Sequence, residues 1–289
     1  MRLSAHDISY AYIPGRPVLT GLSLEIGGKE VLFLLGPNGS GKTTLLECLG
    51  GLRKPQRGKV LLEGRDVYAL PPRSRAKYLG YVPQVHRPVF GFRVWEVVLM
   101  GRAPHLGPLS TPGKEDLRET AWALEAVGLA GLAERPYTEL SGGELRLALI
   151  ARGLAQGVKF LFLDEPDAHL DPGHQHRVLE LIGGLAERGL APVVASHNPN
   201  NALHYGGRVV LLGAGRLLAS GPPGEVLTPG WLRELYGVEF ELLVGEHGRR
   251  ALIPAQGGSD SNASTGRARG SGSRYSRESA ESLPAARKA

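Results

Sequence analysis

The distribution of apolar residues along the chain predicts buried strands that alternate with helices. The run from Glu30 to Leu35 is apolar without alternation and leads into a glycine-rich loop, which is typical of a strand buried on both faces of a parallel sheet. The stretches "KFLFLDEP" and "APVVASH" predict two more strands, and "AKYLGYVPQ" predicts another that ends at Gln84. Helical spacing in "KTTLLECLGGL" and "HQHRVLELIGGLAERG" predicts helices between strands. This alternation indicates a mainly parallel sheet.

Three other regions extend this core. Up to about Glu63, stretches such as "RLSAHDISYAY" and "VLTGLSLEI" read as short strands and turns and predict an N-terminal antiparallel β subdomain. Over about 86–140, helical patterns separated by Pro and Gly predict an inserted helical subdomain, and "VEFELLVGEHGRRALI" predicts a short β extension over 238–256. The main domain would then occupy 1–237, and the fold class is α/β.

The last part of the chain, 257–289, differs in composition. It is rich in Gly, Ser and Arg and has almost no apolar residues, so it cannot repay the entropy of ordering and is expected to be disordered. Its six basic and three acidic residues supply three of the six excess positive charges. The rest of the chain is only mildly basic, which is compatible with anionic nucleotides or a membrane surface and diagnostic of neither.

Composition also bears on the compartment and the redox chemistry. No apolar run approaches the roughly 20 residues that span a bilayer, and the polar N-terminus does not read as a signal peptide, so a cytoplasmic protein is expected. Cys48 is the single cysteine, which excludes an intramolecular disulfide and a multi-cysteine metal cluster. It lies in an apolar helical pattern, which favours a small buried side chain over a reactive thiol.

The motif "GPNGSGKTT" carries the first sign of chemistry. It matches G-x-x-x-x-G-K-[ST] between a predicted strand and a predicted helix, the setting that distinguishes a phosphate-binding P-loop from an ordinary glycine-rich turn. Its backbone N–H groups and the helix N-terminus suit phosphate oxygens. Lys42 would reach the β- and γ-phosphates of ATP, and Thr43 would bind Mg²⁺. The residues of this predicted ATP-binding loop are Gly36, Pro37, Asn38, Gly39, Ser40, Gly41, Lys42, Thr43 and Thr44.

Polar residues at three predicted strand ends could complete the site. Asp164 would hold Mg²⁺ through water and Glu165 would polarise the attacking water, although two carboxylates here could also cap the next helix. His197 could donate a hydrogen bond to the γ-phosphate or could be structural. Gln84 could touch the metal or water, or be an ordinary loop residue. A doubly wound sheet would bring the acidic pair beside the P-loop.

The stretch "LSGGELRLALIARGL" opens a predicted helix with a serine and two glycines, more than a single cap requires. Ser141, Gly142 and Gly143 would offer a hydroxyl, unshielded N–H groups and the positive end of the helix dipole, which together suit a γ-phosphate. Side chains at the two glycines would block its close approach. Since Lys42 would already bind a γ-phosphate within the chain, the phosphate in question would belong to a second subunit.

The P-loop, Gln84, "LSGGE", "FLFLDEP", "AHLD" and "SH" occur in an order and spacing that resemble an ABC-transporter ATPase domain, from Leu3 to about Gly237. The resemblance implies that Glu165 is the general base, His197 the switch histidine and Gln84 the lid-loop glutamine that links the γ-phosphate and Mg²⁺ to the helical subdomain. It also implies that Tyr12, with Tyr10 as the fallback, stacks on adenine. The implied signature residues are Leu140, Ser141, Gly142, Gly143 and Glu144, with Asp171 meeting the partner subunit and Mg²⁺ held by Thr43, Gln84 and Asp164.

Three other stretches, "VVLMGRAPHLG", "LDPGHQHRVLELI" and "GPPGEVLTPGWLRELYGVE", resemble the ATPases of importers for iron-siderophore, haem and cobalamin chelates. This resemblance implies an ATP- and Mg²⁺-dependent subunit that lies peripherally at the cytoplasmic face of the cell membrane and forms a homodimer. The dimer would drive a polytopic membrane permease that takes its cargo from a substrate-binding protein. Nucleic acid is not expected as a partner.

Four residues depart from the family pattern. Asp167 stands where Thr or Ser is usual, Asn198 where Asp is common, and Leu147 where the signature helix usually has a basic residue. Gly153 replaces an alanine, which lowers helix propensity by up to ~1 kcal/mol if the position is interior. None of the four removes a catalytic group, so a competent site is expected.

Other interpretations stay open at this point. An ATPase of the same family could serve a different cargo, or could act on nucleic acid or ribosomes, although no tandem domain, long coiled-coil insertion or basic stripe supports the latter. A P-loop kinase or GTPase would share Lys42 and Asp164 but would have no use for "LSGGE". A metal site in "HLDPGHQH" is disfavoured because His174 and His176, two residues apart, would point to different sides of a helix.

Overall fold

The computed structural model describes residues 1–84, 89–107, 109–245 and 248–255. The segment 257–289, which the sequence predicts to be disordered, lies outside these residues. Within them, no helix has both the length and the apolar character needed to cross a membrane.

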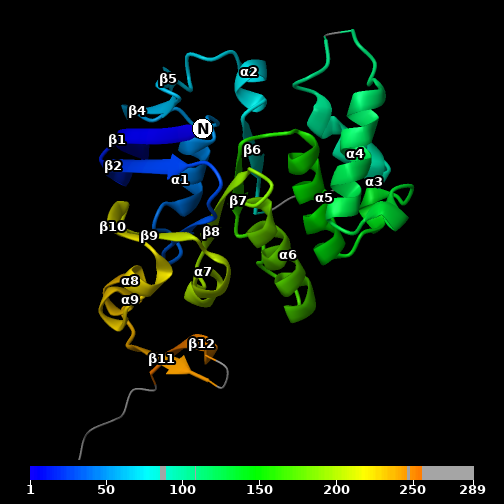
Figure 1. The fold of residues 1–289 in the computed structure, drawn as a ribbon. Coiled ribbons are helices and arrows are strands. Elements are labelled where there is room, and N and C mark those ends of the chain that lie inside the picture. Colours follow the sequence, from blue (N-terminus) through cyan, green and yellow to red (C-terminus); the bar gives the residue numbers. More distant parts are fainter. Residues whose placement is uncertain (85–88, 108, 246–247, 256–289) are drawn as a thin grey trace, which may run out of the picture. The chain divides into compact units, whose positions relative to one another are not determined.

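A six-stranded, mostly parallel sheet forms the centre of the fold (Figure 1). Its strands are β3 (Leu32–Leu35), β6 (Leu79–Val82), β7 (Phe160–Asp164), β8 (Ala191–Ser196), β9 (Arg208–Gly213) and β10 (Arg216–Gly221), in the spatial order β10-β9-β3-β8-β7-β6. All neighbours pair in parallel except β10, which runs antiparallel to β9. The carboxyl ends of β3, β6, β7 and β8 therefore lie at one edge of the sheet, which is where ligands bind in such folds.

A second, antiparallel sheet contains β1 (Arg2–Ile13), β2 (Arg16–Gly27), β4 (Arg57–Leu62) and β5 (Arg65–Asp66), in the order β2-β1-β4-β5. The sequence predicts this subdomain, but β1 and β2 are each 12 residues long rather than short. Their pairing shifts register between Ala5 and Ile8 and again between Ile8 and Tyr10. Bulges of this kind interrupt the alternation of side chains, so one long irregular hairpin reads in the sequence as several short pieces.

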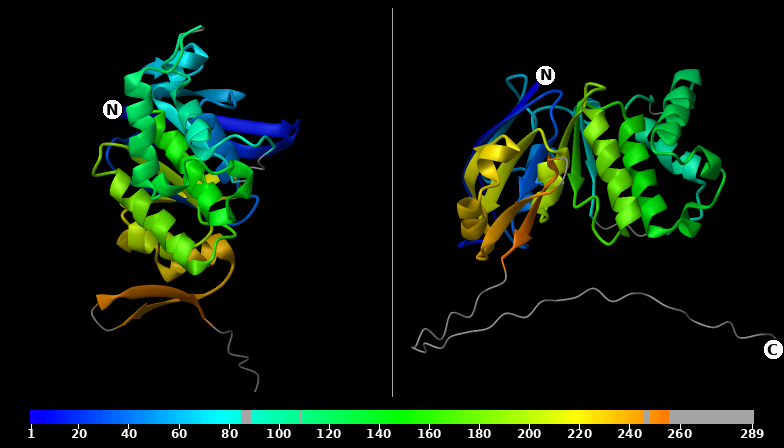
Figure 2. Two further views of the ribbon diagram at one scale, coloured as in Figure 1. Left: turned by 90° about the vertical axis from the view of Figure 1, so that its right-hand side faces the viewer. Right: turned by 60° about the horizontal axis from the view of Figure 1, so that its bottom comes forward.

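Helices cover both faces of the central sheet, and a separate helical group lies beside it (Figure 2). α1 (Lys42–Leu49) packs between the two sheets, and α2 (Pro72–Ala76) precedes β6. The opposite face of the central sheet carries α6 (Pro172–Leu185), α7 (Pro199–Tyr205), α8 (Pro223–Val226) and α9 (Pro229–Tyr236). The helical group comprises α3 (Val94–Leu99), η1 (Met100–Arg102), α4 (Lys114–Ala126), η2 (Ala130–Leu132) and η3 (Tyr137–Glu139), against which α5 (Gly142–Ala155) packs.

The core has two parts, one on each face of the central sheet. Leu34 on β3 belongs to the part of the core with α1 and the antiparallel sheet, whereas its neighbour Phe33 belongs to the part with α5, α6 and α9. Both side chains are buried, which explains why this strand shows no alternation of apolar and polar residues. Cys48 on α1 is fully buried, and burial raises the pKa of its thiol to about 12. The prediction of a small buried side chain at Cys48 is therefore confirmed.

Three predicted boundaries are wrong by one or two residues. β6 ends at Val82 and not at Gln84, because Pro83 has no N–H to continue the ladder. β8 ends at Ser196, one residue before His197. α6 begins at Pro172 rather than His174, since Pro is well suited to the first turn of a helix. Gln84 and His197 therefore lie in the segments just past β6 and β8 rather than within the strands.

A β-hairpin of β11 (Phe240–Val244) and β12 (Arg250–Pro254) follows α9. It is attached to α7 through Asn200, whose side chain donates to the carbonyl oxygen of Leu252 (2.9 Å) and accepts from its N–H (2.8 Å). The side chain of Leu252 is buried in the core at this point. The hairpin is therefore held to α7 by the hydrogen bonds of Asn200 and by the buried side chain of Leu252.

Gly153 has a packing role in α5. A Cβ built on this residue would lie 2.8 Å from Leu161 Cδ1 on β7 and 3.6 Å from Val82 Cγ2 on β6. Its departure from the usual alanine is thus matched by a bulky leucine on the strand beneath. The loss of helix propensity is offset by the closer approach of helix and sheet.

A buried ion pair joins parts of the helical group. Arg102 Nε lies 2.9 Å from Asp116 Oδ1, and the same guanidinium donates to the carbonyl oxygen of Ala155 (2.9 Å) at the end of α5. Hydrogen bonds from the Gly113 N–H and from Arg102 lower the pKa of Asp116. The charged form of Asp116 is therefore favoured in the folded chain.

We expect Asp116→Ala to destabilise the chain by about 3 kcal/mol, because it leaves the buried Arg102 charge without its partner. Urea unfolding measures this cost. Since the pKa of Asp116 is lowered on folding, its contribution is present above the ordinary carboxyl range and is lost as the pH falls through the folded value. The difference between parent and variant should therefore shrink in acid; equal stabilities at neutral pH would contradict the account.

Candidate active site

The P-loop connects β3 to α1, and its lysine is folded inside it. Gly41, the N-cap of α1, has a φ of 101°, which favours glycine, and a Cβ there would lie 2.8 Å from Leu19 Cδ2. Lys42 is 5% exposed, and its Nζ donates to the carbonyl oxygens of Gly36 (2.9 Å) and Pro37 (3.1 Å). Burial lowers the pKa of Lys42, and the neighbouring carboxylate of Glu165 opposes this change. The loop thus holds the Lys42 ammonium group inside it, hydrogen-bonded to two backbone carbonyl oxygens.

Glu165 is the meeting point of the residues predicted to be catalytic. Its Oε1 lies 3.8 Å from Lys42 Nζ and 3.5 Å from His197 Nδ1, and its Oε2 accepts a hydrogen bond from Gln84 Nε2 (2.9 Å). These four residues come from segments that follow β3, β6, β7 and β8. The doubly wound sheet therefore brings them together from distant parts of the chain, as expected.

The backbone of Glu165 has an uncommon conformation. Its φ is 44°, in the left-handed region that non-glycine residues rarely adopt. The side chain is nearly buried, at 12% exposure, and faces the P-loop rather than solvent. Such strain persists only where surrounding contacts fix the residue, and it gathers at functional sites. The reading of this carboxylate as a solvated helix cap therefore finds no support in its geometry.

Asp164 is suited to hold a cation. It is 2% exposed, and its Oδ2 accepts from the Tyr81 hydroxyl at 3.3 Å, but its Oδ1 has no hydrogen-bond partner among the described residues. Burial raises the pKa of Asp164, and the neighbouring Thr43 hydroxyl, the next largest influence, lowers it. A buried, unpaired carboxylate oxygen beside a threonine hydroxyl fits Mg²⁺, which prefers oxygen ligands.

A cavity of about 480 Å³ lies over the P-loop and reaches Gln84, Glu165 and Tyr12. Tyr12 is half-exposed, and its hydroxyl lies 3.1 Å from Thr44 Oγ1. Tyr10 packs edge-on against Tyr12 with ring centroids 5.1 Å apart, and it does not line the cavity. The placement favours Tyr12 over Tyr10 as the aromatic residue that meets a nucleotide base.

The signature segment begins α5 with a reciprocal cap. Ser141 Oγ accepts from the Glu144 N–H (3.3 Å), and Glu144 Oε2 accepts from the Ser141 N–H and hydroxyl, both at 2.8 Å. These bonds lower the pKa of Glu144. None of the residues 140–144 lines the cavity over the P-loop, so within the described chain the signature is not part of the cluster around Lys42.

The two signature glycines have different surroundings. A Cβ on Gly142 would meet nothing within 4 Å, whereas a Cβ on Gly143 would lie 2.3 Å from Cδ2 of His174. For Gly143 the structure adds a reason that the sequence does not indicate, because a side chain there would meet His174 of the same chain. Gly142 keeps an open face.

Asp171 is the N-cap of α6. Its Oδ1 accepts from the backbone N–H groups of Gly173 (2.9 Å) and His174 (3.1 Å), and its Oδ2 lies 2.5 Å from His174 Nδ1. The hydrogen bond with the His174 side chain is the largest of the effects that lower the pKa of Asp171. The Asp171 carboxylate is therefore exposed and also hydrogen-bonded to the first turn of its own helix.

Two arginines near the site are absent from the sequence-based prediction. Arg146 is 7% exposed and donates to the carbonyl oxygens of Pro83 and Gln84, both at 2.6 Å, so it ties the signature helix to the loop that carries Gln84. Its position inside the apolar run "LRLALIA" is a signal for a buried, paired charge. The Arg53 guanidinium lies 4.8 Å from the Tyr12 ring centroid, and no pattern in the sequence indicates this contact.

The remaining departures from the family pattern have structural partners. Asp167 is buried and accepts from Asn201 Nδ2 (2.7 Å), which connects the loop after β7 to α7. Asn198 caps α7 by accepting from the Asn200 N–H (3.0 Å), as an aspartate would. Leu147 is 6% exposed in an apolar cluster. Among the described residues, none of these side chains forms a hydrogen bond or ion pair with the cluster around Glu165.

His174 and His176 point to different partners, as their spacing predicts. His174 Nδ1 faces Asp171, whereas His176 Nδ1 lies 2.8 Å from the Tyr205 hydroxyl. Over the residues that the structure describes, no group of three or more His, Cys, Asp or Glu side chains is placed to hold a metal ion.

Comparison with known proteins identifies the family. A model described as "ABC transporter" matches residues 19–168. The chain belongs to the ABC transporter family. It is 43% identical over 244 residues to the "Hemin import ATP-binding protein HmuV" of Gloeobacter violaceus, an alignment that covers 82% of this chain and 87% of that protein. The resemblance stated from the motifs is confirmed, and the chain is an ATP-binding, ATP-hydrolysing member of this family.

Solved ABC structures share the fold. A metal-chelate type ABC transporter in an inward-facing conformation superposes with a TM-score of 0.77 at 29% identity, covering 88% of this chain and 98% of that one. A bacterial ABC transporter cassette solved in dimeric form gives 0.68 at 26% identity, covering 76% and 98%. The predicted P-loop α/β fold with an antiparallel β subdomain and a helical group is therefore confirmed.

Proposed function

We propose that this ATPase drives a membrane importer for a metal chelate of the iron-siderophore, haem or cobalamin class. The observation that carries the proposal is the cluster of Lys42, Gln84, Glu165 and His197 around one nucleotide cavity, in a chain 43% identical to a hemin import subunit. The metal-chelate transporter with the same fold supports the cargo class.

Within the site, each residue has a distinct role. Lys42 and the P-loop N–H groups bind the β- and γ-phosphates, and Tyr12 stacks on adenine. Asp164, Thr43 and Gln84 would hold Mg²⁺, which would neutralise phosphate charge. Glu165 orients and deprotonates the attacking water, and His197, 3.5 Å from it, donates to the γ-phosphate. Gln84 links Glu165 to the helical group through the loop that Arg146 holds.

The signature segment acts on the nucleotide of a second copy. Ser141, Gly142 and Gly143 begin a 14-residue helix, whose N-terminus favours an anion, yet they do not line this chain's own cavity. Two copies arranged head to tail would each place this helix end over the ATP of the other, with Asp171 at the contact. The dimeric cassette among the similar structures supports this arrangement.

Exposed apolar residues after Gln84 form the surface that meets the permease. Val89, Phe90 and Phe92 are 79%, 68% and 43% exposed, and the ring centroids of the two phenylalanines lie 5.9 Å apart. Such a cluster at the end of the lid loop is suited to protein contact. Through it the chain would lie peripherally at the cytoplasmic face of the membrane, and nucleotide-dependent motion of Gln84 would reach the permease.

Affinity purification of the full chain from native membranes tests the function. We expect a polytopic permease to be recovered, and Phe90→Asp to reduce its recovery about tenfold, because a charge in an apolar contact is costly. Val244→Asp, which alters an exposed apolar residue on β11, serves as the matched control and should recover the permease normally. When the chain is reconstituted with that permease, its ATP turnover should rise on addition of chelate-loaded binding protein. Salt-sensitive nucleic-acid binding without a permease would contradict the proposal.

A further inference from the structure

His174 lies where α6 approaches the signature helix. Its ring covers Gly143, since a Cβ on that glycine would lie 2.3 Å from Cδ2 and 2.5 Å from Cγ of the imidazole. An alanine at position 143 could not be accommodated without moving the ring or the helix end. The glycine and the histidine therefore fit each other within one chain.

The other side of the same imidazole is fixed. Nδ1 lies 2.5 Å from Asp171 Oδ2, and the other carboxylate oxygen of Asp171 caps the first turn of α6, including the His174 N–H. His174 is 29% exposed and the carboxylate of Asp171 is 62% exposed, so the pair lies at the surface with the aspartate outermost. One side chain thus connects the cap of α6 with the first turn of α5.

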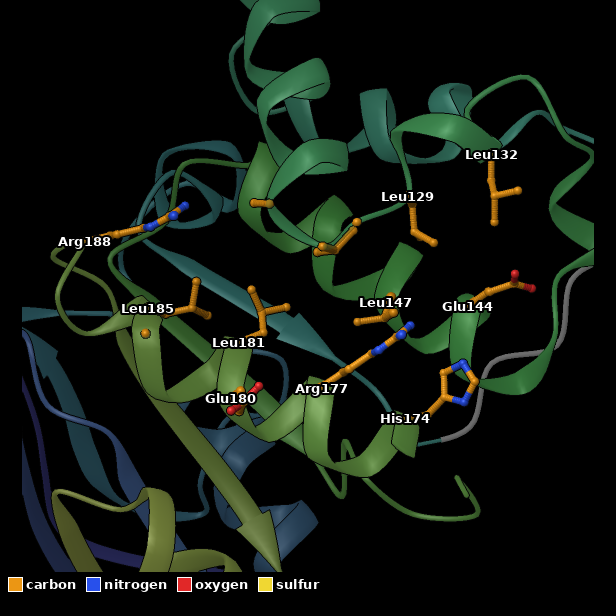
Figure 3. Close-up of a pocket in the computed structure, with 14 residues that line it drawn as sticks. Leu129, Leu132, Glu144, Leu147, His174, Arg177, Glu180, Leu181, Leu185 and Arg188 are labelled. Atoms are coloured by element: carbon orange, nitrogen blue, oxygen red, sulfur yellow. The ribbon is translucent and has the colours of Figure 1, made fainter. Parts of the chain in front are cut away.

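Past this contact a cavity lies between α6 and the segment from the end of α4 to η2, with Glu144 and Leu147 of α5 also lining it. Figure 3 shows His174 and Glu144 at one end of it, with Leu147 on α5 facing Leu181 on α6 farther along. The cavity has a volume of about 560 Å³, and at its other end the Arg188 guanidinium lies 5.8 Å from the Trp122 ring centroid on α4. The His174–Gly143 contact therefore lies at one end of this cavity, where α6 meets the first turn of α5 directly.

We propose that His174 is a positioning residue that holds the signature turn of α5 and the Asp171 cap of α6 as one unit. Both segments are those that the proposed function assigns to the contact with the partner subunit, so the inference rests on that function. If both must reach the partner's nucleotide together, a fixed spacing between them reduces the entropy lost when the dimer closes. Lys42, Glu165 and His197 lie outside these contacts, so binding of ATP within one chain does not depend on the pair.

The test uses the full chain carrying Glu165→Gln, so that ATP is bound without turnover. Analytical ultracentrifugation with saturating ATP gives the dimer dissociation constant, and a fluorescent ATP analogue gives nucleotide affinity at concentrations where the chain is monomeric. We expect His174→Ala to weaken the dimer roughly tenfold, with nucleotide affinity changed less than twofold. His174→Asn, which can keep a donor near the Nδ1 position, should retain most of the dimer strength.

His176→Ala is the matched control, because His176 lies on the same helix but faces Tyr205 on α7. It should dimerise like the parent. The inference is overturned if His174→Ala dimerises as tightly as the parent, or if the two alanine variants weaken the dimer equally. The inference is also overturned if His174→Asn dimerises as weakly as a folded His174→Ala. If the alanine variant does not fold, a His174→Asn variant that stays monomeric with saturating ATP overturns it. Failure of the Glu165→Gln parent itself to dimerise would instead refute the proposed nucleotide sandwich.

Discussion

Glu165→Gln should lower ATP turnover by roughly 100-fold to 10,000-fold, the range that a general base contributes. The amide keeps the size of the side chain but cannot accept a proton from the attacking water. It also removes the negative charge 3.8 Å from Lys42 and 3.5 Å from His197, so ATP should bind at least as well as before. Steady-state phosphate release and ATP binding, measured separately, distinguish these two effects.

Asp167→Asn is the matched control for this change. Asp167 lies two residues away and is also buried, but its carboxylate pairs with Asn201 rather than with Lys42. We expect this variant to keep turnover within about tenfold of the parent, because it alters no group that faces the reacting phosphate. Equal losses in the two variants would mean that general damage to the loop after β7, and not removal of a base, explains the result.

Lys42→Ala should weaken ATP binding by roughly 100-fold. Lys42 Nζ is the buried cation of the cavity, and the Gly36 and Pro37 carbonyl oxygens that now accept from it would be left without that donor. Phosphate oxygens would then face carbonyl oxygens and the Glu165 carboxylate with no compensating charge. Isothermal titration with ATP measures the loss.

The pH dependence of ATP binding offers a second check on Lys42. Because burial lowers the pKa of Lys42, its positive charge is lost at a less alkaline pH than that of an ordinary lysine. ATP affinity should therefore decline as the pH rises toward the alkaline range. Lys59→Ala, which removes an exposed lysine on β4, should leave both the affinity and its pH dependence unchanged; an identical effect of Lys59→Ala would refute a specific role for Lys42.

The parts of the fold and site that are predictable from the sequence are those with a local signal. The strand "VLFLLG" is apolar throughout because both of its faces are buried, and the P-loop that follows has a fixed spacing of glycines and lysine. Strand ends are less certain because they depend on which neighbour continues the ladder. Gln84 lies two residues past β6 for this reason, although its place beside Glu165 follows from the parallel sheet.

Contacts between segments distant in the sequence have no such signal. The ring of His174 on Gly143 crosses 31 positions of the chain, and Arg146 reaches Gln84 across 62. Neither residue shows by its neighbours which partner it will meet, because the pairing depends on how α5, α6 and the loop after β6 pack. The sequence predicts that Gly143 needs to lack a side chain, and the structure adds a physical reason within the same subunit.

The central claim is that each ATP is bound between the P-loop of one subunit and the signature of the other. Its most direct test mixes two variants in the Glu165→Gln background: Lys42→Ala, which lacks the P-loop lysine, and Gly142→Asp, which places a negative charge at the signature. Gly142 has open space around it, and an acidic residue is favourable in the first turn of a helix, so the second variant should fold and bind ATP in its own cavity.

Neither variant alone should dimerise with ATP. A mixed dimer has one site with both defects and one site with none, so an equal mixture, with one variant tagged, should give an ATP-dependent mixed dimer that retains one ATP per pair. A mixture that stays monomeric, or a Gly142→Asp chain that dimerises alone as tightly as its parent, would contradict an active site shared between two subunits.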